Sequence, residues 1–259
     1  QTRLTMALLR QTFFIYLRNL KTWTAQPATL LTAIASSAFM FIFFGAPLGK
    51  LTLLPGFPAD SYQAYLTGMV LVMTVVFSGS DMAMVLLTDI LSGYFDKLLL
   101  SPVNRLAILL GTLAIGATRA LAQVVVIILI ALAFGVRFEA GLLGVIAIVV
   151  ATTTFGVAMS CIGLVLALRT KSVQVTMNSW LLFMPLAFLT TAFMPKELLS
   201  GWFEVAVRFN PVDYVMSAVR AVIIEGWVWS AILPGVWVLV GMTAVLLSFT
   251  TWQYRRATA

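Results

Sequence analysis

Few residues in this chain could carry acid–base, nucleophilic or metal chemistry. Its 259 residues include no His and a single Cys, Cys161. The absence of His excludes His-based acid–base pairs, HExxH zinc sites and His-ligated haem within the polypeptide. One Cys excludes an internal disulfide and a CxxC redox pair. We therefore predict that the chain is not an enzyme and has no catalytic residue or metal site of its own.

Two ionisable residues fall inside apolar stretches long enough to cross a membrane. Asp81 lies near one end of the second stretch and Arg119 lies within the third. A charge in hydrocarbon is costly unless it finds a partner or water. Neighbouring antiparallel helices would bring the two side chains together, so we expect an intramembrane ion pair that fixes two helices. A contact with substrate is the alternative.

The chain lacks a nucleotide-binding motif. Its nearest match to a phosphate loop, Gly45 to Leu51, has three residues between the glycines where the motif needs four. Leu51 also stands where Ser or Thr would hold magnesium. ATP and Mg²⁺ would therefore bind another chain. The net charge of +7 fits a membrane surface, and we do not expect nucleic-acid binding.

The segment from Thr88 to Arg105 combines charged, aromatic and aliphatic residues. Its pattern predicts a short amphipathic helix that lies parallel to the membrane and offers a face to a cytoplasmic partner. A solvated interfacial turn would show a similar pattern. The residues that characterise the segment are Asp89, Tyr94, Phe95, Asp96, Lys97 and Arg105, with Pro102 ending the run.

These residues need membrane helices to position them. The chain is 61% hydrophobic and 10% charged, whereas soluble domains carry about 25% charged residues. Crossing the bilayer takes about 20 mostly apolar residues in a helix. The sequence therefore predicts an all-α membrane protein, one domain over residues 1–259, with six transmembrane helices. They run approximately Ala28 to Leu48, Tyr62 to Leu87, Leu106 to Phe134, Leu142 to Leu168, Thr176 to Met194 and Ala231 to Trp252.

The distribution of basic residues predicts the orientation. Six crossings place both termini on one side, and cytoplasmic termini put most Lys and Arg residues inside. Within residues 1–27, Arg3, Arg10, Arg18 and Lys21 share one edge of a helical wheel. This pattern predicts a helix in the inner interface with its basic edge near anionic headgroups, and a flexible basic tail is the alternative.

The last outer segment, Pro195 to Ser230, differs from the other connections. Its length and apolar character favour two short helices broken at Asn210-Pro211, because Pro211 can begin a helix but discourages continuation of the one before. These helices would rest at the outer interface or dip into the membrane. On the third span, small residues form a stripe that predicts close helix packing. The stripe consists of Ala107, Gly111, Ala114, Thr118 and Ala122.

Two motifs resemble those of a known family. SGYFDKLLLSPVNRLAILLGTLA, from Ser92 to Ala114, is similar to the signature after the second span in ABC-2 type permeases, particularly the drug-resistance branch related to the daunorubicin exporter permease. FMPKELLSGWFEVAVRFNPVDYVMSAVRAVIIEG, from Phe193 to Gly226, resembles the family's segment between spans five and six. Gly201 precedes Trp202, where many relatives have proline, which affects only the outer turn.

The resemblance implies a permease subunit of an ATP-binding cassette exporter for hydrophobic or amphipathic compounds, drugs or lipids. It would pair with an identical or homologous permease, contact membrane lipids and bind two cytoplasmic ATPase subunits that hold the ATP and Mg²⁺. The expected location is the cytoplasmic membrane, in bacteria, with both termini inside. Residues 88–105 would form the coupling helix that docks on the ATPase, 195–226 the outer re-entrant helices, and spans one and five the dimer seam.

The same resemblance implies two sets of site residues. The coupling residues would be Asp89, Gly93, Tyr94, Phe95, Asp96, Lys97, Ser101, Pro102 and Arg105. The outer gate residues would be Pro195, Trp202, Asn210, Pro211, Tyr214 and Arg220.

Two other functions remain open. The same kind of machine could export a polysaccharide or lipid-linked glycan, although the spans supply few polar groups for such a path. An ion-coupled transporter would need titratable groups at the membrane midplane, and Asp81 with Arg119 offers little of this.

Overall fold

The computed structural model describes residues 2–25, 61–192 and 199–258, together with residues 31, 35, 38, 39, 41–43, 52 and 59. The side chains of residues 2–5, 78, 80, 81 and 180 are outside this description. Regular structure in the described part is helical, as expected for an all-α membrane protein. Its helices are α1 Thr2–Thr24, α3 Tyr62–Leu91, α4 Tyr94–Leu100, α5 Arg105–Ala133, α6 Gly141–Thr170, α7 Val173–Met177, α8 Trp180–Phe188, α9 Trp202–Arg208, α10 Pro211–Ile224 and α11 Trp229–Thr258.

In the part of the chain that the structure describes, four helices are long and apolar enough to cross a membrane: α3, α5, α6 and α11. They match the second, third, fourth and sixth predicted spans. Most of the first predicted span, Ala28 to Leu48, lies outside the described residues.

The fifth predicted span, Thr176 to Met194, is not one continuous helix. It divides into α7 and α8 at Asn178 and Ser179, where the Ser179 N–H turns to the Thr176 carbonyl three residues back at 3.2 Å. The break does not fall at Pro185, since α8 continues through that residue. The predicted end is also too late, because the chain leaves the helix after Phe188.

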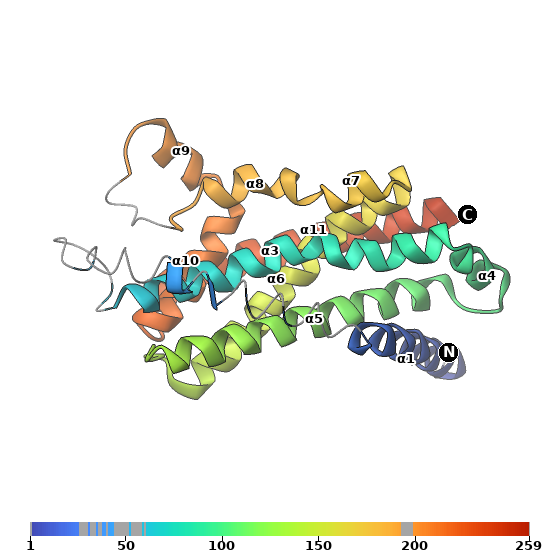
Figure 1. The fold of residues 1–259 in the computed structure, drawn as a ribbon, viewed down its shortest axis with the longest axis horizontal. Coiled ribbons are helices and arrows are strands. Elements are labelled where there is room, and N and C mark those ends of the chain that lie inside the picture. The colour runs from blue at the N-terminus through green and yellow to red at the C-terminus, as the bar shows by residue number, and fades with distance from the viewer. Residues whose placement is uncertain are drawn as a thin grey trace.

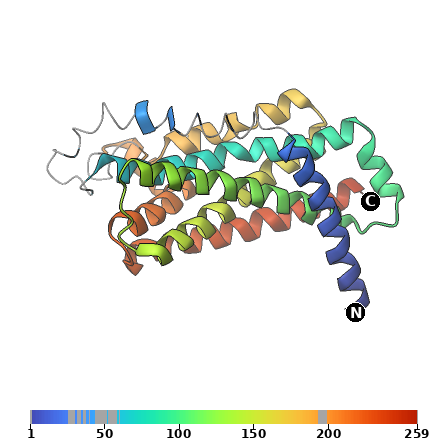
Figure 2. The same ribbon diagram turned by 60° about the horizontal axis from the view of Figure 1, so that its bottom comes forward.

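The long helices run side by side, with different features at their two ends (Figure 1). Both termini and α4 lie at one end, which we call the α4 end. The opposite end, which we call the α9 end, carries α9 and the turn between α5 and α6. Helix α1 crosses the α4 end at an angle to the long helices (Figure 2). An even number of crossings would give this arrangement of termini.

Helix α3 occupies the centre and packs on α6, α5 and α10. Small residues let α3 and α6 approach closely. A Cβ atom added to Gly163 would lie 2.9 Å from the Gly79 carbonyl oxygen. In α3, 73% of an apolar stretch of 18 residues is buried within the protein, compared with 17% of the corresponding stretch in α11. Helix α3 is therefore a core element of the bundle, and α11 lies at its periphery.

The stripe of small residues on α5 receives α1. A Cβ atom on Gly111 would lie 2.7 Å from Cγ2 of Ile15. The Thr118 hydroxyl donates to the Tyr16 hydroxyl at 3.2 Å, and Trp23 is buried. The packing role predicted for this stripe is confirmed, and it fixes α1 against the bundle.

At the other end, the two short helices predicted on either side of Asn210-Pro211 are present. Pro211 opens α10, and the Asn210 side chain accepts a hydrogen bond from the Val212 N–H at 3.0 Å. This is an N-cap, which satisfies a backbone donor that the first turn leaves unpaired.

Candidate functional site

The turn between α3 and α5 is shaped by two of the predicted coupling residues. Gly93 has φ +71°, a left-handed conformation that suits glycine, and it separates α3 from α4. The Ser101 hydroxyl donates to the Leu98 carbonyl at 2.7 Å and closes the last turn of α4. Both residues therefore define the shape of this segment.

Helix α4 has an anchored face and an exposed face. Phe95 is buried and meets Tyr254 of α11 edge to face, with 6.2 Å between the ring centroids. Asp96 and Lys97 are exposed, and Leu100 is 88% exposed. The structure thus turns Phe95 into its own chain instead of toward a partner, because its ring fills an apolar cluster with Leu86 and Ile108 among others.

Arg18 connects α1 to this segment. Its Nη1 donates to Oδ2 of Asp89 at 2.7 Å, and its Nη2 donates to Oδ1 of the same carboxylate. The guanidinium carbon also lies 3.9 Å from the centroid of the Tyr94 ring. Hydrogen bonding to Asp89 raises the pKa of Arg18 above its ordinary value. Arg18 thus has two partners within the chain, Asp89 and Tyr94, that the sequence did not reveal. The position of the basic edge of α1 near lipid headgroups stays a prediction.

Gln11 holds the other end of the segment. Its Nε2 donates to the Pro102 carbonyl at 3.3 Å, and its Oε1 accepts from the Asn104 N–H at 2.9 Å. Arg105 is exposed at the start of α5. Helix α1 therefore contacts the chain on both sides of α4.

Sequence reasoning did not identify Gln11 or Arg18 as partners of this segment. Their spacing contained a signal, since residues seven apart lie two turns apart on the same helix face. We call α4 together with Gln11, Arg18 and Asp89 the clamped α4 unit.

A second polar feature lies buried at α10. Arg220 donates to the Thr191 carbonyl at 3.0 Å and to the Thr191 hydroxyl at 3.2 Å, and its guanidinium carbon is 3.6 Å from the Tyr65 ring centroid. Thr191 in turn donates to Oδ1 of Asp213 through its N–H at 2.7 Å and its hydroxyl at 2.6 Å. The Tyr65 hydroxyl donates to the same Thr191 carbonyl at 2.6 Å. We call these four residues the Thr191 cluster.

The predicted outer residues do not all gather there. Asn210 fastens the start of α10 to the end of α8 by donating to the Leu186 and Leu189 carbonyls, each at 2.5 Å. Tyr214 donates to the Arg208 carbonyl at 2.9 Å, and Trp202 is exposed beside Phe203. Pro195 lies outside the described residues.

Three members of the Thr191 cluster, Tyr65, Thr191 and Asp213, were not predicted as site residues. Asp213 and Arg220 stand seven residues apart on α10, which places them on one helix face. That spacing could have identified Asp213. Thr191 could not be identified in this way, because it reaches the cluster only through the fold.

The predicted pair of Asp81 and Arg119 remains a prediction. The Asp81 side chain is outside the described part of the structure. Arg119 is partly buried in α5, with its guanidinium carbon 5.6 Å from the Trp23 ring of α1. Trp23 is thus a neighbour of Arg119 that the sequence did not reveal.

The acidic and sulfur-containing side chains are scattered. Within the described ranges, no three of the Cys, Asp or Glu residues lie close enough together to hold a metal ion. Cys161 is buried in α6.

Comparison with known proteins agrees with this architecture. The chain is 28% identical over 170 residues to the daunorubicin resistance ABC transporter permease protein of Streptomyces coeruleorubidus, covering 62% of this chain and 59% of that protein's length. It is 23% identical over 240 residues to the doxorubicin resistance ABC transporter permease protein of Mycobacterium tuberculosis, covering 93% of this chain and 86% of that protein. Residues 10–224 match the family described as ABC-2 type transporter, so the chain belongs to this family.

Proposed function

We propose that this chain is the permease subunit of an ABC exporter, driven by two separate ATPase subunits that dock on α4. Its cargo would be hydrophobic or amphipathic compounds, such as drugs or lipids. Membership of the ABC-2 family and the names of the two resistance permeases support this proposal. The single observation that carries it is the exposed face of a firmly anchored α4.

The exposed face of α4 has the chemistry of a docking surface. Asp96 and Lys97 offer opposite charges, and Leu100 offers an exposed apolar side chain next to them. Charged groups of this kind can set the register of a partner, while the apolar side chain supplies buried area.

The anchors of α4 explain how a docked ATPase would move the bundle. A helix of only seven residues without contacts to other helices would move by itself and would not move the bundle. Here Phe95 packs on Tyr254 of α11, and Arg18 of α1, which is paired with Asp89 of α3, lies over Tyr94 in the first turn of α4. Gln11 binds the chain after α4. Motion of the exposed face would thus reach three other helices, α1, α3 and α11. ATP binding would shift the bundle by favouring one of its arrangements, and cargo would bias the same equilibrium.

The assembly follows from the same proposal. The α4 end and both termini would lie in the cytoplasm, in the cytoplasmic membrane. A second permease, identical or homologous, would pack along the first and fifth spans. Exposed apolar side chains on α8, including Leu182 and Phe188, fit such a seam. At the opposite side, α9 and α10 would close the outer end, held to α3 and α8 by the Thr191 cluster and Asn210.

The proposal can be tested in proteoliposomes that contain the permease and an ABC ATPase that co-purifies with it. We expect the Asp96→Ala/Lys97→Ala variant to insert normally and to lose about tenfold in ATP-driven transport, within the usual range of coupling energies. The matched control is Arg137→Ala/Glu139→Ala, an exposed pair of opposite charge in the turn between α5 and α6. Transport by the purified chain without nucleotide and without an ATPase would refute the proposal.

A further inference from the structure

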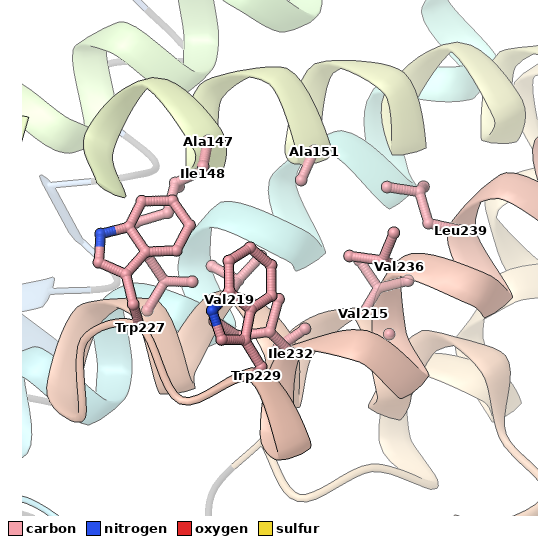
Figure 3. A pocket seen from close by; sticks show the side chains of 13 residues that line it. Ala147, Ile148, Ala151, Val215, Val219, Trp227, Trp229, Ile232, Val236 and Leu239 are labelled. Atoms are coloured by element: carbon pink, nitrogen blue, oxygen red, sulfur yellow. The ribbon is translucent and has the colours of Figure 1, made fainter. Parts of the chain in front are cut away.

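An apolar cleft lies between α6, α10 and α11, apart from the clamped α4 unit and the Thr191 cluster (Figure 3). Ala147 and Ala151 of α6 form one wall, Val219 belongs to α10, and Val236 and Leu239 come from α11. Trp227 and Trp229 stand at one end, and Leu239 lies at the other. The cleft thus runs along α11.

The lining determines what kind of ligand can enter. Among the described residues that form it, none has a charged side chain, a hydroxyl or an amide, and the two indoles supply the side-chain N–H groups. A polar ligand group would lose its hydrogen bonds to water here without replacement. The part of a ligand inside the cleft must therefore be hydrocarbon.

The size of the cleft further limits the ligands that it can bind. Its volume is about 140 Å³. Sites for drug-sized molecules have volumes of roughly 300–1,000 Å³. A polycyclic drug would not fit in this volume, and the apolar lining excludes a sugar, whereas a length of one linear hydrocarbon chain would fit.

The surroundings place the cleft in contact with lipid. Helix α11 is the most exposed of the four long apolar helices, and its outward residues Trp237 and Val240 are exposed and apolar. Trp227 lies between α10 and α11, and Trp229 begins α11; their ring centroids are 5.7 Å apart. Tryptophan concentrates at the membrane–water interface, where the ring is apolar and the N–H stays near water.

We propose that this cleft binds one acyl chain of a membrane phospholipid, with the headgroup beside Trp227 and Trp229 and the chain directed toward Leu239. Because α10 forms one wall, the bound chain packs between α10, α6 and α11. Helix α10 carries Asp213 and Arg220, so lipid in the cleft stabilises the helix that holds the Thr191 cluster. The site does not depend on which cargo the permease moves.

The test uses the whole protein in phosphatidylcholine nanodiscs with a trace of a phospholipid that carries a diazirine midway along one acyl chain. After illumination, labelled positions are mapped by peptide mass spectrometry. We expect labels to concentrate on residues 215–239 and on Ala147 and Ala151. The variants Ala151→Trp and Val236→Trp fill the cleft, and each should lower this labelling roughly fivefold, because a Trp ring takes the space of the chain.

Val240→Trp is the matched control, since Val240 lies one turn along the same helix on the exposed surface. Its labelling should stay at the wild-type level. Thermal unfolding and size-exclusion profiles identify a variant that fails to fold. If Ala151→Trp fails to fold, the labelling of Val236→Trp tests the proposal, because Val236 is already partly exposed at the edge of the cleft and tolerates a larger side chain. Labels spread evenly over exposed apolar positions such as Leu142 would overturn the proposal. Labelling at the wild-type level in both cleft variants, or a cleft covered by a second permease without lipid, would also overturn it.

Discussion

Arg18 of α1 and Asp89 of α3 are joined by two hydrogen bonds across 71 positions of sequence. The bidentate arrangement uses the planar guanidinium fork that lysine lacks. Because Arg18 also lies over the Tyr94 ring, one side chain connects three helices at the α4 end. Helix α1 is therefore part of the machinery around α4 and does more than rest on the membrane surface.

We predict that Arg18→Ala weakens this connection. Arg18 is more than one-third exposed, so solvent screening limits the loss of unfolding free energy to about 1 kcal/mol. The effect on ATP-driven transport should be larger, a several-fold loss. Thermal unfolding and transport measured side by side separate the two effects.

Matched variants sharpen this test. Arg18→Lys should restore little, because it cannot form the paired bonds, and Arg10→Ala on the exposed side of α1 should behave like the wild type. A double-mutant cycle with Asp89→Ala measures the pair directly. Additive effects of the two single substitutions would show that the residues do not act together.

A second prediction separates the two faces of α4. Phe95→Ala should cost about 3 kcal/mol in unfolding free energy, because it leaves a cavity in the cluster around Tyr254. Leu100→Ala should leave stability unchanged and reduce co-purification of the ATPase, since Leu100 faces outward. Thermal unfolding and pull-down yield provide the two readings. The opposite pattern would mean that Phe95 is the contact and Leu100 the anchor.

The all-α fold and the four long spans could be predicted because apolar length alone specifies them. The break at Asn210-Pro211 was equally accessible, since proline acts on the local backbone. The end of the fifth span could not be predicted from the sequence. Thr191 lies beyond the end of α8 and binds Asp213, which is 22 positions away in the sequence. No local sequence pattern indicates that bond.

The contacts of the predicted coupling residues could be inferred from the sequence only in part, for a similar reason. Amphipathic spacing places Phe95 and Asp96 on a short helix but does not say which of them meets the rest of the chain. That choice depends on Tyr254, at the far end of the sequence. The contribution of Gln11 likewise depends on where α1 crosses the bundle.

The Thr191 cluster gives a third prediction. Asp213 and Arg220 are both buried and meet at Thr191, to which each is hydrogen-bonded. Asp213→Asn keeps the shape of the side chain but removes the negative charge from this cluster, and leaving a buried charge uncompensated costs about 3–5 kcal/mol. The double variant Asp213→Asn/Arg220→Met removes both charges and should recover a large part of this loss. Thermal unfolding of the three proteins checks the order. A double variant less stable than Asp213→Asn would show that the charges do not compensate each other.

The last prediction concerns the close crossing of α3 and α6. In Gly163→Ala, the new Cβ would lie 2.9 Å from the Gly79 carbonyl oxygen, and this atom cannot move without shifting the α3 backbone. Since α3 is the central helix, the two helices must separate, and overpacking of this kind costs about 1–3 kcal/mol. Gly241→Ala in α11 is the control, because no atom lies within 4 Å of its added Cβ. Thermal unfolding should therefore show a loss for Gly163→Ala alone, and equal stability of the two variants would mean that the crossing tolerates a wider separation than its geometry indicates.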